Sequence, residues 1–416
     1  MTPREERGKV IAETCTVKKN GKLWHVPSQS GRGTYTVNLE RTYCSCPDFI
    51  ERGEPCKHIF AVRFVVTKTV RHADGSETVT TVSVEQRTTY KQDWPNYNAA
   101  QVGEHRHFQT FLADLCGTLP PPAPKPGRPP LLPSDAAFCA IYKTYSTMSA
   151  RRFAGDLDEA HQLGHITHVP HFNSVLNFFD GEDTADILLR FVTLSAAPLA
   201  GVETKFAVDS TGFSGASHIR WFDEKYGRPR SEVKWVKLHA MIGVNTNVIA
   251  NCKVTGKECT DGPELPGLVN ATAEQFRIDE VSADKAYTSR NNFAAVEGVG
   301  AQFYPAFKKN ATGKVGGSFE KALLLMRLNE EEYGKHYHLR SNAESAFSSL
   351  KRKLGPALRA KSDRAMRNEV LAKVVAYNLT CVIQAVYELG IAPEFVFKPR
   401  CTITPDAAQL PLENQP

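Results

Sequence analysis

The segment Tyr-His-Leu-Arg-Ser-Asn-Ala-Glu-Ser-Ala-Phe-Ser-Ser-Leu-Lys, residues 337–351, decides how we interpret the rest of the chain. At about 100° per residue of an α-helix, four of its polar side chains share a sector of roughly 60°: Tyr337, Arg340, Glu344 and Lys351. Apolar residues form the neighbouring face, so we expect one helix that docks on a sheet. The polar stripe is either a solvated face with an Arg340–Glu344 ion pair, worth a few tenths of a kcal/mol, or a group that holds a phosphate and a metal together.

Basic residues continue from this segment toward the C-terminus. Seven of them lie from Lys351 to Arg367, against one acidic residue. Such a run is commonly a solvated surface, but its position beside the polar stripe favours contact with phosphate groups. We therefore take Lys351, Arg352 and Lys353 as candidate phosphate-binding residues.

The composition of the chain sets wide limits on its function. Its 416 residues suffice for two to three domains with separate cores. A formal net charge of +6 permits a nucleic-acid partner without requiring one. Ten cysteines, of which three form one local cluster, are typical of a reducing compartment, so we expect a cytoplasmic protein. The longest apolar stretch, residues 370–389, is interrupted by polar side chains and predicts a core helix rather than a membrane span.

Three cysteines and a histidine form a compact motif near the N-terminus. Cys44-Ser-Cys46 is followed by nine residues and then by Cys56-Lys-His58. Three thiolates and one imidazole can close a tetrahedral Zn²⁺ site that has a structural role. The alternative is a chance grouping of free thiols. The motif resembles the SWIM zinc finger, whose pattern is Cys-x-Cys followed by Cys-x-His.

Two aspartates each follow a short apolar run, in Lys205-Phe-Ala-Val-Asp209 and in Val281-Ser-Ala-Asp284. If these runs are neighbouring strands, Asp209, Asp284 and Glu344 come together. Three unpaired carboxylates would repel one another, whereas Mg²⁺ or Mn²⁺ would neutralise them and accept their oxygen atoms as ligands. Taken alone, Asp209 could equally be a turn residue at the end of a strand. The combination predicts a metal site for phosphoryl transfer.

Strand and helix patterns alternate around these residues. Strands are expected over residues 205–209, 235–244, 248–254, 281–284 and 301–307. Three antiparallel strands followed by alternating helices and strands predict an α/β fold with a central mixed sheet.

These motifs together resemble a known family. The spacing from Tyr337 to Lys351, Tyr-(2)-Arg-(3)-Glu-(6)-Lys, is similar to the signature of one branch of the DDE transposases of bacterial insertion sequences. The segments around Asp209 and Asp284 resemble the two aspartate segments of that family, although Ala286 stands where the family often has Gly. The resemblance covers residues 125–390.

The resemblance implies a ribonuclease-H-like catalytic core with helical additions, and a reaction that cleaves and joins DNA strands. It implies these roles: catalysis and Mg²⁺ (or Mn²⁺) binding by Asp209, Asp284 and Glu344, and phosphate binding by Tyr337, Arg340 and Lys351. Double-stranded DNA would be the partner, a homodimer would hold two element ends, and the protein would be associated with the nucleoid.

The domain organisation that follows has five parts. They are a SWIM-type zinc module at 1–90, a polar and Pro-rich linker at 91–133, a helical DNA-binding region at 134–200, the catalytic domain at 201–392 and a C-terminal tail at 393–416. In the helical region we expect helices over residues 135–146, 148–163 and 171–179.

Two other functions fit the same residues. A DNA-binding regulator derived from a transposase would use the finger and the basic helix without catalysis, although it would not need three clustered acids. A nuclease built on the same core would cut DNA but never join it.

Overall fold

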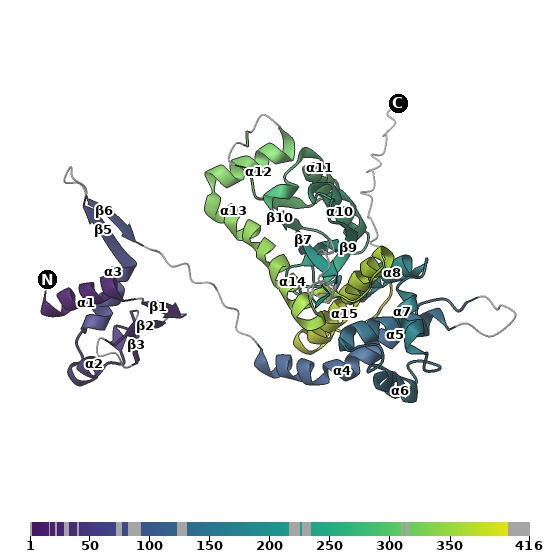
Figure 1. The fold of residues 1–416 in the computed structure, drawn as a ribbon. Helices are drawn as coiled ribbons and strands as arrows, with labels where there is room; N and C mark the ends of the chain where they lie inside the picture. Colours follow the sequence, from purple (N-terminus) through teal and green to yellow (C-terminus); the bar gives the residue numbers. More distant parts are fainter. Residues whose placement is uncertain are drawn as a thin grey trace, which may run out of the picture. The chain divides into compact units, whose positions relative to one another are not determined.

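The structure is a computed structural model (Figure 1) that describes residues 2–15, 17–20, 23–28, 33–39, 41–71, 77–81, 93–122, 131–215, 225–226, 234–308, 311–312 and 316–397. The chain divides into two compact units, Met1–Lys91 and Gln92–Pro416, and each is described by itself. Residues 123–130 of the Pro-rich linker and residues 398–416 of the tail lie outside the described residues.

The first unit is a small sheet packed against helices. Its elements are α1 (Pro3–Thr14), β1 (Lys18–Asn20), β2 (Leu23–Pro27), β3 (Thr34–Asn38), β4 (Tyr43–Cys44), α2 (Pro47–Arg52), α3 (Lys57–Val66), β5 (Thr67–Arg71) and β6 (Glu77–Thr81). Strands β1 to β4 form one antiparallel sheet, and β5 pairs with β6. Helices α1 and α3 pack closely because Gly8 has no side chain; a Cβ atom there would lie 2.6 Å from the Cβ of Phe60.

The second unit contains the mixed sheet. It begins with α4 (Trp94–Cys116), α5 (Pro133–Ser146), α6 (Ala154–Gln162), α7 (Phe172–Phe178), α8 (Thr184–Ala196) and η1 (Ala197–Leu199). The chain then forms β7 (Lys205–Gly215), β8 (Trp235–Gly243), β9 (Ile249–Gly256), η2 (Gly262–Glu264), α10 (Leu265–Ala273), β10 (Glu280–Ala283), η3 (Lys285–Tyr287), α11 (Arg290–Gly298) and β11 (Gln302–Pro305). It continues with α12 (Gly317–Leu328), α13 (Glu330–Tyr337), η5 (His338–Arg340), α14 (Ser341–Leu354), β12 (Ala357–Leu358) and α15 (Asp363–Leu389).

The strands of this sheet lie in the order β11-β10-β7-β8-β9. β7, β8 and β9 are antiparallel neighbours, whereas β10 pairs in parallel with both β7 and β11. The prediction of an α/β fold with a mixed sheet is confirmed.

Helices cover both faces of the sheet. Successive residues of a strand point to opposite faces, and on β7 the side chains of Asp209, Thr211 and Phe213 face η5, α14 and α15. On the other face, His239 of β8, the strand partner of Ser210, contacts Asp261 beside η2. Figure 1 shows α13 and α14 following one another along the sheet.

The longest helix, α15, forms the centre of the second unit. It is long and apolar enough to cross a membrane by length and composition, but most of it is buried inside the unit, which agrees with the predicted core helix. Its few polar side chains bind backbone groups of neighbouring elements. Asn378 donates to the carbonyl of Ile249 and accepts from the amide of the same residue, both at 2.9 Å. Lys373 donates to the carbonyls of Leu354 and Gly355, each at 2.7 Å, and so caps the end of α14.

Two expectations about the region before the sheet are wrong. Residues 94–116, expected to be linker, form α4, because Phe108, Leu112 and Leu115 make an apolar face that packs into the core of the second unit. The helix expected over 148–163 is shorter and spans Ala154–Gln162 as α6; before it, α5 ends at Thr147, which has a left-handed backbone conformation at φ 55°.

The segment 337–351 is not one helix. Tyr337 ends α13, residues 338–340 form a 3₁₀ turn, and α14 begins at Ser341. The turn lies between two docking regions, since α13 packs on β10 and β11 while α14 packs on β7 and β8. A 3₁₀ turn rotates the chain by more per residue than an α-helix does, so it adjusts one helix to the other.

Asp209 does not end its strand as predicted. β7 continues to Gly215 because it pairs with β8 from Phe206 to Ser214, and Asp209 therefore lies in the middle of the strand. β10 does end just before Asp284.

Replacing Lys373 by Met keeps the apolar stem but removes the donor that caps α14. We expect a loss of about 2–4 kcal/mol in the free energy of unfolding, because buried carbonyls are left without partners. Denaturant unfolding measures this loss. Lys361→Met, at an exposed position close in sequence, is the matched control and should change the free energy by less than about 0.5 kcal/mol. Equal stability of the two variants would contradict the capping role.

Candidate functional site

The pairing of β7 with β10 brings two of the predicted acids together. The parallel register places Ala283 beside Val208, and the next residues along the two strands are Asp284 and Asp209. Asp209 is held by a strand that is paired on both sides, with β8 and with β10. The predicted neighbourhood of Asp209 and Asp284 is therefore a direct consequence of the sheet order.

Backbone amides orient both carboxylates. Oδ1 of Asp209 accepts from the amide of Ser210 at 2.8 Å, and Oδ1 of Asp284 accepts from the amide of Lys285 at 2.7 Å. In each aspartate, one carboxylate oxygen therefore accepts a hydrogen bond from the backbone amide of the next residue. The second oxygen of Asp209, Oδ2, lies 3.8 Å from the guanidinium of Arg340.

Arg340 joins the third acid to the first. Its other terminal nitrogen lies 2.7 Å from Oε1 of Glu344, one helical turn further on in α14. The Glu344 side chain is 59% exposed, whereas those of Asp209 and Arg340 are 23% and 22% exposed. A half-buried arginine therefore contacts both Asp209 and Glu344.

The electrostatics of Asp209 reflect this crowding. Burial is the largest influence and raises the pKa of Asp209, while the Ser210 amide and Arg340 act to lower it. The charges of Asp284 and Glu344 raise it further. The pKa of Asp209 is thus raised by both other acids, as expected where like charges lie close together.

The three carboxylates do not form a closed metal-binding shell. Among the residues that the structure describes, the only group of three or more potential ligands drawn tightly together is the cysteine–histidine group described below. The donor set nevertheless suits Mg²⁺ or Mn²⁺, which prefer carboxylate oxygens completed by water and phosphate oxygens.

The candidate phosphate-binding residues lie in different surroundings. Tyr337 is partly buried, and Arg352 is exposed. Lys351 instead donates to Oγ1 of Thr211 at 2.6 Å, and burial lowers its pKa. Lys353 forms an ion pair with Glu104 of α4 at 2.7 Å. Of the three basic residues 351–353, only Arg352 therefore points outward without a described contact to another element.

Sequence reasoning missed two partners of this helix. Thr211 could have been found, because it lies two residues after Asp209 and so on the same face of β7. Glu104 carried no such signal, since it falls in the segment that was expected to be linker.

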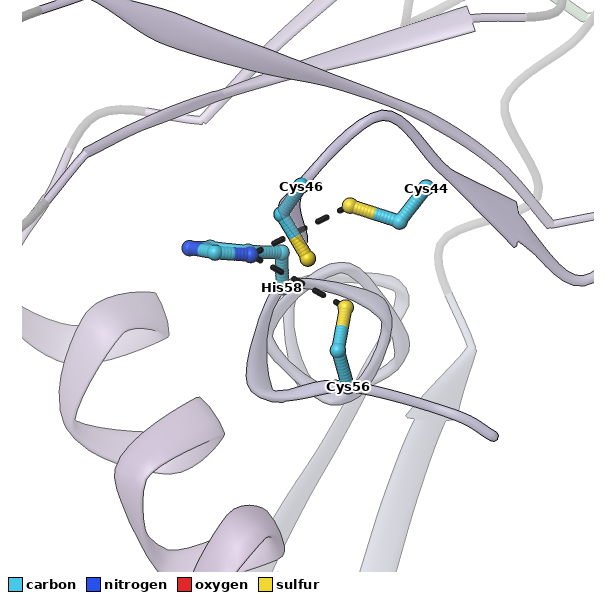
Figure 2. A group of neighbouring side chains, drawn as sticks. All are labelled: Cys44, Cys46, Cys56 and His58. Carbon is cyan, nitrogen blue, oxygen red and sulfur yellow. Dashed lines mark hydrogen bonds between the residues drawn. The ribbon is translucent and has the colours of Figure 1, made fainter. Parts of the chain in front are cut away.

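The four zinc-ligand candidates come together in the first unit (Figure 2). Cys44 ends β4, Cys46 precedes α2, and Cys56 and His58 lie at the start of α3. All four are buried, and their ligand atoms lie within 4.8 Å of one another. The predicted cluster is confirmed.

The geometry of this cluster fits a tetrahedral zinc ion. Nδ1 of His58 lies 3.9 Å from Sγ of Cys44 and 3.8 Å from Sγ of Cys56. Bond lengths of about 2.3 Å to sulfur and 2.0–2.1 Å to nitrogen give ligand–ligand separations of roughly 3.5–3.8 Å in a tetrahedron. The set contains three soft sulfur ligands and one nitrogen, and it leaves no open position.

Charge also favours a cation in the cluster. Hydrogen bonds from Cys44 and then from His58 lower the pKa of Cys56, whereas the hydrogen bond with Cys56 is the largest cause that raises the pKa of Cys44. One thiolate is thus stabilised at the expense of its neighbour. A divalent cation would stabilise all of them as thiolates.

Comparison with family models covers both regions. Residues 200–379 match the family described as the transposase DDE domain, a range that includes Asp209, Asp284 and Glu344. Residues 35–62 match the SWIM zinc finger and include all four cysteine and histidine ligands. No solved structure matches the chain. The mixed sheet is thus the ribonuclease-H-like core of a DDE domain, and such a domain implies a metal-dependent enzyme that acts on DNA. The chain contains a transposase DDE domain preceded by a SWIM zinc finger.

Proposed function

We propose that the protein cleaves DNA at the ends of an insertion sequence and transfers the freed strand to target DNA. The observation that carries this proposal is the parallel register of β7 and β10, which makes Asp209 and Asp284 neighbours. The contact of Arg340 with both Asp209 and Glu344 supports including the third acid in the site.

In this proposal Asp209, Asp284 and Glu344 hold Mg²⁺ or Mn²⁺. The chemistry that such cations supply is activation of the attacking oxygen and stabilisation of the leaving oxygen in phosphoryl transfer. The two backbone amides that bind Asp209 and Asp284 keep the carboxylates oriented. Because those amides use only one oxygen of each aspartate, the other oxygen remains for the site.

Arg340 is proposed to bind a phosphate of the DNA next to the cut. Its planar guanidinium can form paired hydrogen bonds to a phosphate, in place of the contact with Glu344. Tyr337 precedes η5 directly and is proposed to contact the same backbone. Lys351, held at Thr211, adds positive charge beside Asp209.

Joining two element ends requires that both be held at once, and we therefore propose a homodimer on double-stranded DNA. The protein would act in the cytoplasm in association with the nucleoid.

Replacing Asp209 or Asp284 by Asn, or Glu344 by Gln, should abolish DNA nicking while DNA binding stays within about threefold. If the metal ions no longer stabilise the transition state by several kcal/mol, the rate of DNA cleavage falls on the order of 1,000-fold. The measurement is Mg²⁺- or Mn²⁺-dependent nicking of DNA that carries the element's own ends. Asp279→Asn, at a partly exposed acid just before β10, is the matched control and should nick at the normal rate. Full activity in any of the three variants would refute its assignment.

The same assay separates the alternatives. Binding of the element ends without any nicking would favour a regulator derived from a transposase. Nicking without strand transfer to a second DNA would favour a nuclease on the same core.

Arg352 and Lys353 should behave differently although they are adjacent. Arg352→Gln should weaken DNA binding and reduce the slope of log affinity against log salt by about 0.9, which corresponds to one lost phosphate contact. Lys353→Gln should leave the slope unchanged, because Glu104 already pairs with Lys353. Fluorescence anisotropy over a range of salt concentrations measures both slopes. Equal slopes for the two variants would contradict this distinction.

The finger should bind one Zn²⁺ per chain. Cys56→Ser should lose the metal and expose the backbone of residues 35–62 to hydrogen exchange, because a structural zinc site contributes folding free energy directly. Elemental analysis and exchange mass spectrometry check these outcomes. Cys15→Ser, at a partly buried cysteine of the same unit, is the control and should retain zinc. Stoichiometric zinc in Cys56→Ser would count against the ligand set.

A further inference from the structure

A buried charged group lies on the strands of the catalytic aspartates, at the ends opposite the site. Glu280 is the first residue of β10, and its side chain is only 9% exposed. One carboxylate oxygen lies 2.7 Å from Nζ of Lys205, the first residue of β7. The other lies 2.5 Å from Nδ1 of His336 in α13. Glu280 thus links both aspartate-bearing strands to the helix that precedes the site.

Further contacts fix the His336 ring. It stacks on the ring of Tyr304 in β11, with centroids 4.4 Å apart and the planes inclined by 10°. Its Nε2 lies 3.7 Å from Glu332 one turn earlier. The neighbouring Tyr333 donates its hydroxyl to the carbonyl of Pro305 at 2.7 Å. α13 is therefore attached to β10 and β11 through specific polar contacts.

The spacing of this group repeats that of the catalytic residues. Lys205 and Glu280 are each four residues before Asp209 and Asp284, so they lie on the same face of their strands. His336 is likewise four residues before Arg340. Glu344 follows eight residues after His336, beyond the 3₁₀ turn at residues 338–340 and in the first turn of α14.

Fold stability alone does not explain a buried ion pair at this place. Replacing buried ion pairs by apolar residues is often neutral or stabilising, and their best-attested use is to fix one arrangement among several. Here two arrangements differ in how α13 and α14 are placed relative to each other. The 3₁₀ turn at residues 338–340 separates these two helices, so each could dock on the sheet independently. The contact between His336 and Glu280 lies two residues before this turn, and Arg340 and Glu344 follow it in the chain.

We propose that His336 is a positioning residue: through Glu280 it sets the place of Arg340 and Glu344 relative to Asp209 and Asp284. This inference rests on the proposed function, in which those four residues form the site. His336 itself does not touch DNA or the reacting atoms.

The test compares three variants of the full-length chain. His336→Leu removes the donor to Glu280, while His336→Asn retains a donor close to the position of Nδ1. His338→Leu makes the same change two residues later at an exposed position, and serves as the control.

The first measurement is hydrogen exchange of residues 337–344 without DNA or metal. We expect about tenfold faster exchange in His336→Leu, because the turn is released locally. His336→Asn should be intermediate and His338→Leu unchanged. The second measurement is single-turnover cleavage at saturating DNA. His336→Leu should be slower by up to about 100-fold, as for a misplaced catalytic group, with the dissociation constant for DNA unchanged and partial recovery in His336→Asn.

The two proposals fail in distinguishable ways. If the wild-type chain does not cleave DNA at all, the proposed function fails, and the exchange rate of residues 337–344 still decides whether His336 positions the turn. Wild-type exchange in His336→Leu, or cleavage within twofold of wild type, would overturn the positioning role. If His336→Leu does not fold, Glu280→Gln replaces it, because this variant keeps the size of the side chain and removes its charge. Wild-type exchange of residues 337–344 in Glu280→Gln, or cleavage within twofold of wild type, would likewise overturn the positioning role.

Discussion

The parallel pairing of β7 with β10 is the constraint on which the site depends. If Val208 and Ala283 were paired in antiparallel strands, the residues that follow them would lie on opposite sides of this pair and would not be neighbours. In the parallel register the next residues are Asp209 and Asp284, on adjacent strands and at the same level. Since β7 also pairs with β8 over nearly its whole length, the first aspartate stands on a rigid strand. Sites on such elements hold their geometry better than sites on loops.

The helix that carries Glu344 is fastened to this sheet at several points. Ala343, Ala346 and Phe347 bury the face of α14 that packs against the sheet. Lys351 reaches Thr211 on the strand of Asp209, and Lys373 of the core helix binds the last carbonyls of α14. Polar groups inside the protein thus supply the alignment, while apolar packing supplies most of the burial. The Glu344 side chain is largely exposed, and Arg340 is its only described ion-pair partner.

How far the sequence predicts this structure depends on how local each signal is. The zinc ligands were predictable because their spacing within one short loop already fixes the chemistry, and the structure confirms their cluster. The mixed sheet followed from strand patterns. The extent of β7 did not, because Ser210, Thr211 and Gly212 look like a turn, and only their pairing with β8 makes them a strand. The helical spacing of Phe108, Leu112 and Leu115 could have predicted α4, but the segment was assigned to a linker because the residues around it are polar and rich in proline.

Contacts between distant residues were beyond sequence reasoning. Glu104 and Lys353 are separated by 249 positions, and Glu280 and His336 by 56. Nothing in the local pattern of either pair indicates its partner. The 3₁₀ turn before α14 was also not predictable from local sequence. It lies where α13 and α14 dock on different strands of the sheet, and this docking is not visible in the sequence of residues 338–340.

The central claim is that Asp209, Asp284 and Glu344 share divalent cations. Anomalous diffraction from crystals of the protein bound to an element end and soaked with Mn²⁺ tests it most directly. The account predicts anomalous density within bonding distance of carboxylate oxygens from all three residues. Absence of such density at adequate Mn²⁺ concentration, or density that excludes any of the three, would contradict it.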